Sequence, residues 1–77
     1  MPLTNVERDY LKLLGRNIVK IRKEKKLKQE GLSDLLDMDD GSLRRIESGR
    51  TNPTTITLLR IANALGIEIK DLFEITI

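Results

Sequence analysis

The sequence lacks several residue types on which whole classes of function depend. None of its 77 residues is cysteine or histidine, which removes disulfides, the usual metal ligands and the commonest general base. Its two aromatic residues, Tyr10 and Phe73, are too few for a surface that stacks the bases of single-stranded nucleic acid. No apolar run approaches the roughly 20 residues that a membrane-spanning helix needs. We therefore expect no enzyme, no metal or cofactor, and no membrane partner.

Length and charge narrow the classes of function that remain. The chain is long enough for one small domain, expected over residues 1–77, and its N-terminus lacks the apolar core of a signal peptide, which favours the cytoplasm. The net charge is only +2, which is weak evidence for nucleic acid. The distribution of charge along the chain is more informative than the net charge. Seven basic residues and one acidic residue lie in residues 16–28, whereas five acidic residues and no basic residue lie in residues 30–40.

Apolar periodicity predicts five short helices joined by brief connections. Thr4 and Glu7 fit a capping box at the start of the first helix, and Gly15 inside that helix indicates a close helix crossing. Gly49 and Gly66 stand where the third and fourth helices would end. The expected helices span about residues 5–25, 29–36, 40–48, 55–65 and 69–74. This pattern predicts an all-α fold, a compact five-helix bundle.

The stretch from residue 29 to residue 49 fits two helices joined by a tight turn. Leu32, Leu35 and Leu36 recur at helical spacing, so we expect them to share one face of the first helix. In the second helix, the apolar side that includes Leu43 lies roughly opposite a polar and basic side. A DNA-reading helix pair and an ordinary helical hairpin with a solvated outer face fit these residues about equally well.

An ordered set of short segments extends over about four-fifths of the chain. It comprises Leu14-Gly15…Ile18…Ile21-Arg22, Gln29…Leu32, Leu43…Ile46-Glu47-Ser48-Gly49-Arg50, Asn52-Pro53, Leu58-Leu59…Ile61-Ala62…Ala64-Leu65-Gly66-Ile67 and Leu72-Phe73. In order and spacing, this set resembles the Cro/CI repressor-type helix-turn-helix domain, also called the XRE type. The resemblance implies a five-helix DNA-binding domain, usually dimeric, whose third helix enters the major groove.

The chain departs from that family around the turn. Asp37 stands where glycine is usual, which is tolerable because aspartate visits the left-handed backbone region more readily than most residues. Ser33 stands where alanine is usual, and Lys25-Lys26 replace a frequent glycine. Asp39 and Asp40 begin the recognition helix, where carboxylates repel phosphates but can also cap the helix (Asp39) or accept from a cytosine amino group (Asp40).

The candidate site residues fall into four groups. Base reading is expected from Asp40, Gly41, Ser42, Arg44 and Arg45, because arginine suits bidentate contact with guanine. Phosphate contact is expected from Lys28, Gln29, Arg50, Thr51 and Asn52. The resemblance gives Arg22 and Glu47 a structural role, an ion pair that locks the recognition helix to the core. Phe73, Ile75 and Ile77 predict an apolar dimer interface near the C-terminus.

The leading functional hypothesis is therefore a sequence-specific transcription regulator that binds double-stranded DNA as a homodimer, without a small-molecule ligand. The alternative is a protein-interaction module that kept this fold and lost DNA binding. The acids at Asp37, Asp39 and Asp40 favour the alternative. Steep salt dependence of DNA binding would separate the two.

Overall fold

A computed structural model describes residues 2–75 of the chain. In this part of the chain the elements are α1 (Asn5–Glu24), α2 (Gln29–Leu35), α3 (Asp40–Glu47), α4 (Thr55–Leu65) and η1 (Ile69–Phe73). The all-α fold is confirmed, and every bound lies within one residue of the expected one. The expected count of five α-helices is slightly off, because η1 is a 3-10 helix, a form that is common in short segments.

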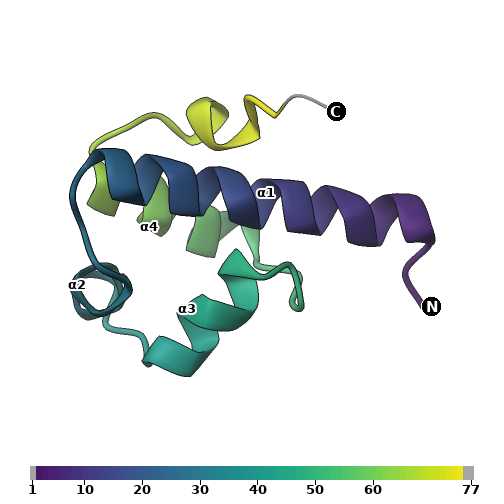
Figure 1. The fold of residues 1–77 in the computed structure, drawn as a ribbon, viewed down its shortest axis with the longest axis horizontal. Helices are drawn as coiled ribbons and strands as arrows, with labels where there is room; N and C mark the ends of the chain where they lie inside the picture. Colours follow the sequence, from purple (N-terminus) through teal and green to yellow (C-terminus); the bar gives the residue numbers. More distant parts are fainter. Residues whose placement is uncertain (1, 76–77) are drawn as a thin grey trace.

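The long helix α1 runs across the molecule and the other elements surround it. Figure 1 shows α4 behind α1, α2 and α3 on one side of it, and η1 on the opposite side. The N-terminal end of α1 extends beyond the shorter helices in this view. Within residues 2–75, no helix combines the length and the apolar character that crossing a bilayer requires.

Short polar signals define the helix ends. Thr4 and Glu7 form the expected capping box on α1, which confirms that prediction. Thr54 caps α4 by accepting from the backbone N–H of Thr57. Gly49 and Gly66 follow their helices with φ of 75° and 71°, a conformation in which a side chain would be strained.

The core fills the space between the four α-helices and η1. It consists of Leu14, Ile18, Leu32, Leu43, Ile46, Leu58, Ile61, Ala62, Leu65 and Leu72. The prediction that Leu35 shares the buried face of α2 is wrong, because its side chain is 61% exposed. α2 packs on α3 and α4 along the side that carries Leu32 and Leu36, and Leu35 at the last position of this short helix lies outside that contact.

Two contacts fix α1 to its neighbours. A Cβ atom at Gly15 would overlap the carbonyl oxygen of Glu47 and would lie 2.7 Å from that of Ile46, so α1 and α3 cross in backbone contact. This confirms the close crossing predicted at Gly15. On the other side of α1, Asn17 Nδ2 donates to the carbonyl oxygens of Asp71 and Leu72 at 3.1 and 2.7 Å, which holds η1 in place.

Candidate nucleic-acid interface

The turn between α2 and α3 sets the angle of the helix pair. Asp37 occupies it with φ of 52°, in the left-handed region that the sequence led us to expect there. The buried hydroxyl of Ser33 lies 3.0 Å from the carbonyl oxygen of Glu30 and donates to Oδ1 of Asp40, the first residue of α3. This link, which joins α2 to α3 in addition to the turn, was not predicted. Its signal was a serine at a buried position where the family has alanine.

A buried polar cluster joins α1, α2 and α3. Arg22 Nε donates to Glu47 Oε2 at 2.7 Å, and its Nη2 donates to Oε1 at 3.3 Å. Gln29 Nε2 donates to the same Oε1 at 2.8 Å, and Arg22 Nη1 donates to the carbonyl oxygen of Leu27 at 3.0 Å. The side chains of the ion pair are only 9% and 5% exposed. The first residue of α2 and the last residue of α3 therefore share one carboxylate.

The start of α3 is held by its own side chains. Asp39 accepts from the backbone N–H of Ser42 at 3.0 Å and from its hydroxyl at 2.6 Å, and these hydrogen bonds lower the pKa of the Asp39 carboxyl. Arg45 Nη2 donates to the Ser42 hydroxyl at 3.2 Å. Gly41 packs against the carboxylate of Asp39, since a Cβ atom at position 41 would be 3.1 Å from Asp39 Oδ2.

The candidates for base reading differ in how exposed their side chains are and in whether they already have partners within the protein. Arg44 and Arg45 are exposed, and Gly41 and Ser42 are half-buried. Asp40 is half-buried, and one of its oxygens is engaged by the Ser33 hydroxyl. The outer side of α3 therefore presents two guanidinium groups.

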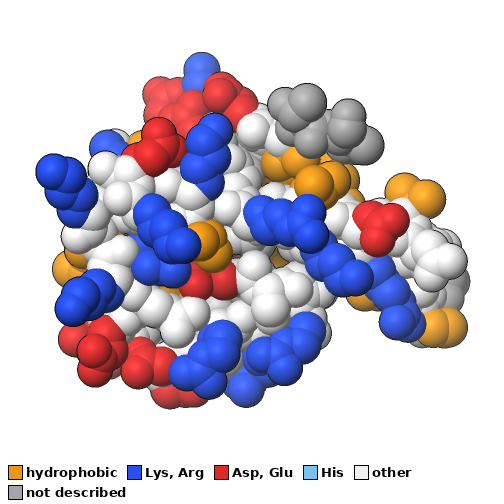
Figure 2. Space-filling model, viewed as in Figure 1, with side chains coloured by type: hydrophobic (Ala, Val, Ile, Leu, Met, Phe, Trp, Pro, Cys, Tyr) orange, Lys and Arg blue, Asp and Glu red, His pale blue; other side chains and the backbone are white. Residues whose placement is uncertain are grey.

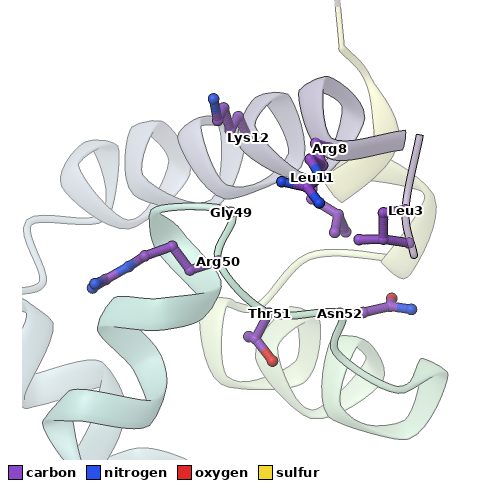
Figure 3. Close-up of a pocket in the computed structure, with 8 residues that line it drawn as sticks. All are labelled: Leu3, Arg8, Leu11, Lys12, Gly49, Arg50, Thr51 and Asn52. Carbon is purple, nitrogen blue, oxygen red and sulfur yellow. The ribbon is translucent and has the colours of Figure 1, made fainter. Parts of the chain in front are cut away.

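The candidates for phosphate contact lie on both sides of α3. Lys28 is exposed ahead of α2, whereas Gln29 is half-buried through its bond to Glu47. After α3, Arg50 Nε donates to the Ser48 hydroxyl at 2.9 Å. An open hollow of about 570 Å³ lies between this loop and α1 (Figure 3), lined by Leu3, Arg8, Leu11, Lys12, Gly49, Arg50, Thr51 and Asn52.

Charge is unevenly distributed over this side of the molecule. Figure 2 shows lysine and arginine side chains over α1 and over α3, while acidic side chains gather over η1 and beside the turn between α2 and α3. Within residues 2–75, no group of three or more acidic side chains is arranged to hold a metal ion.

The expected dimer residues differ in their placement. Phe73 is 41% exposed, and Ile75 is half-buried and packs against the core. Ile77 lies outside the described residues.

Comparison with known proteins gives consistent matches. The helix-turn-helix family model HTH_3 matches residues 18–72. The chain is 42% identical over 59 residues to the uncharacterized HTH-type transcriptional regulator y4dJ of Sinorhizobium fredii, covering 77% of each protein. It is 37% identical to the control protein C.MunI of Mycoplasma sp, covering 78% of this chain and 82% of that protein. The crystal structure of the restriction-modification controller protein C.AhdI from Aeromonas hydrophila superposes with a TM-score of 0.78 at 34% identity, covering 84% of this chain and 97% of that one.

Proposed function

The chain belongs to the HTH_3 helix-turn-helix family, of the Cro/CI (XRE) type, and from this premise we propose that it reads double-stranded DNA in the cytoplasm as a small dimer. It is a DNA-binding transcriptional regulator and not an enzyme. The relatives named as an HTH-type transcriptional regulator and as controller proteins support a regulatory role.

The observation that carries the proposal is the shared carboxylate of Glu47. By holding both Arg22 and Gln29, it ties α3 to α1 and to the first residue of α2. A helix fixed in this way presents its outer side as a rigid surface, as insertion into a major groove requires. Gln29 also opens α2, where free backbone N–H groups suit a phosphate.

We assign roles on this surface by exposure and chemistry. Arg44 and Arg45 are the base-reading candidates, because both are exposed on α3 and arginine pairs with guanine O6 and N7. Arg50 follows α3 and is assigned to the backbone, together with the other phosphate candidates on the two flanks of α3, Lys28, Gln29, Thr51 and Asn52. Asp40, with one oxygen bonded to Ser33, is a secondary candidate that would accept from cytosine through its other oxygen, and Gly41 and Ser42 leave room for the bases.

The acids that favoured a protein-interaction module have local structural roles in the protein. Asp39 caps α3 through Ser42, and Asp40 accepts from Ser33. Asp37 occupies the left-handed position of the turn. Because each acid has a local structural role, they do not favour the alternative over DNA binding.

The proposal is tested by comparing variants of a residue assigned to base contact and of a residue assigned to phosphate contact. A bound site is first selected from a random duplex pool, and each variant is then titrated with salt on that site and on a scrambled duplex. Arg45→Ala should lose about 1–3 kcal/mol on the selected site and much less on the scrambled one. Arg50→Ala should weaken both duplexes about equally and reduce the salt slope by about one for each bound protomer.

Arg44→Ala is the matched variant for the reading role. If the Arg44 and Arg45 variants both weaken the two duplexes equally, neither arginine reads sequence. Specificity would then come from Asp40, Ser42 or DNA shape. Wild-type binding that does not respond to salt would contradict the DNA-binding proposal itself.

The dimer proposal rests on Phe73, a large apolar side chain that is 41% exposed on η1. A two-fold pairing of this end would set the two α3 helices about 34 Å apart, one turn of DNA. Phe73→Asp should give a folded monomer in sedimentation, whereas Ile75→Asp should also lower stability because Ile75 packs against the core. A wild-type monomer at tens of micromolar, where an interface of about −8 kcal/mol would be largely occupied, would contradict this proposal.

A further inference from the structure

We propose that the N-terminal half of α1 forms a second surface for the DNA backbone, made by Arg8 and Lys12 beside the loop that follows α3. The inference rests on the proposed DNA binding and extends it to a part of α1 that precedes residues 18–72, the segment matched by the family model.

Arg8 and Lys12 share a hollow with residues already assigned to phosphate. They line it from α1, while Arg50, Thr51 and Asn52 line it from the loop after α3 (Figure 3). A DNA backbone that follows the loop after α3 would thus meet α1 next.

The geometry of α1 places the two cations side by side. Residues four apart on a helix are separated by about 40° around the axis and about 6 Å along it. Both side chains are exposed, and the ion pairs found within residues 2–75 are Arg22–Glu47 and Lys70–Glu68, so neither cation is neutralised in this part of the chain. Of the two neighbouring acids, Glu7 turns back to accept from the backbone N–H of Thr4, and the exposed Asp9 is in neither of the ion pairs found within residues 2–75.

This part of α1 is mounted rigidly on the recognition helix. A Cβ atom at Gly49 would lie 2.6 Å from Cα of Lys12 and 2.7 Å from its backbone nitrogen. α1 therefore touches the glycine that follows α3, and the backbone that carries the two cations has a fixed position relative to that of Arg50. Because this backbone is already ordered, no segment of the chain has to be ordered when DNA binds.

The arrangement fits an extended polyanion better than a single small anion. The charged ends of Lys12 and Arg50 point apart in Figure 3 rather than converging on one point. Figure 2 shows basic side chains continuing along α1 on the same side of the molecule as those over α3. A chain of phosphates satisfies separated cations, whereas one phosphate does not. The contact carries no base information and should add affinity for any sequence.

The test uses the double variant Arg8→Gln/Lys12→Gln, which removes two charges and retains part of each side-chain stem. The matched control is Lys20→Gln/Arg60→Gln, which removes one lysine and one arginine, both exposed: Lys20 borders a hollow with Asp71 and Glu74, and Arg60 lies on α4. Binding is measured by fluorescence anisotropy on a selected site within a duplex of about 30 base pairs, three helical turns. Thermal melts confirm that each variant folds.

Loss of two phosphate contacts per protomer should reduce the salt slope by about 1.8, and weaken binding roughly 60-fold at 0.1 M salt, for each half-site that the proposed dimer occupies. The loss should be equal on selected and scrambled duplexes, and hydroxyl-radical protection should disappear from backbone positions outside the selected sequence. The control should behave like wild type. If the Arg8/Lys12 variant matches the control while the wild type binds DNA with a steep salt slope, the second surface is wrong and the proposed function stands. If the wild type shows no salt-dependent binding, the proposed function fails instead.

Discussion

Replacing Gly15 with alanine should destabilise the protein, although alanine is the better helix former. Inside a helix, alanine is favoured over glycine by about 1 kcal/mol. At Gly15, however, the new methyl group would meet the backbone carbonyl groups of Ile46 and Glu47, with the carbonyl carbon of Glu47 at 2.7 Å. Because both contacts are to backbone, no side-chain rotation relieves them.

The magnitude follows from the distance that must be gained. Ordinary contacts of this kind lie near 3.5 Å, so α1 and α3 must separate by about 1 Å. Overpacking of this size costs about 1–3 kcal/mol or more. The same shift stretches the buried pair between Arg22 and Glu47, which joins the same two helices. Because the overlap is with backbone, we place the cost at the upper end of this range, about 3 kcal/mol. Subtracting the gain in helix propensity of about 1 kcal/mol leaves an expected net loss of about 2 kcal/mol.

Gly31 supplies the matched control. It lies in α2, and a Cβ atom there would be 3.5 Å from Cδ2 of Leu27, an ordinary contact. Gly31→Ala should therefore be neutral or stabilise the protein by up to about 1 kcal/mol. Urea unfolding of both variants, followed by far-UV circular dichroism, gives the two free energies of unfolding. A Gly15→Ala variant as stable as Gly31→Ala would refute the close crossing of α1 and α3.

Three further predictions concern charge and backbone strain. Glu47→Ala should cost about 3–5 kcal/mol in a urea melt, because it leaves a buried arginine unpaired, whereas Lys70→Ala, which breaks an exposed pair, should change stability by less than about 1 kcal/mol. Lys26→Gly should stabilise by about 0.5–1 kcal/mol, because Lys26 has a φ of 59°, and an unchanged melting temperature would argue against strain there. The pKa of Asp39 is lowered from its usual 3.8, so near this pH the folded protein binds fewer protons than the unfolded chain. The ionised Asp39 therefore stabilises the fold above about pH 4, and this stabilisation is lost as the pH falls through the lowered pKa. Asp39→Asn keeps a capping side chain and should reduce the loss of thermal stability as the pH falls below about 4, and an acid profile identical to that of wild type would contradict this role.

The elements were predictable because their signals are local. The capping box of Thr4 and Glu7 and the glycines at Gly49 and Gly66 lie within one turn of the ends that they define. Periodicity failed at Leu35, because a helix of seven residues has room for apolar side chains on more than one side. Which side is covered depends on where α3 and α4 lie, and that is set far away in the sequence.

The candidate site was only partly predictable for the same reason. The resemblance named Arg22 and Glu47 as a pair, but the bond from Gln29 to the same carboxylate joins residues 18 apart and follows from no local pattern. Asn17 and the carbonyl oxygens of η1 are 54 and 55 residues apart. The four-residue spacing of Arg8 and Lys12 was visible, yet only the contact with Gly49 shows which neighbour they face.

The bond between Gln29 and Glu47 has a consequence for the entropy of binding. A free glutamine loses about 0.5–1.5 kcal/mol of rotamer freedom when a partner immobilises it. Gln29 is already held by Glu47 at 2.8 Å, so this loss occurs when the protein folds. The amide nitrogen keeps a second N–H group for a phosphate. In the proposed complex, the first contact of α2 with DNA would therefore be made by a side chain whose conformation is already selected.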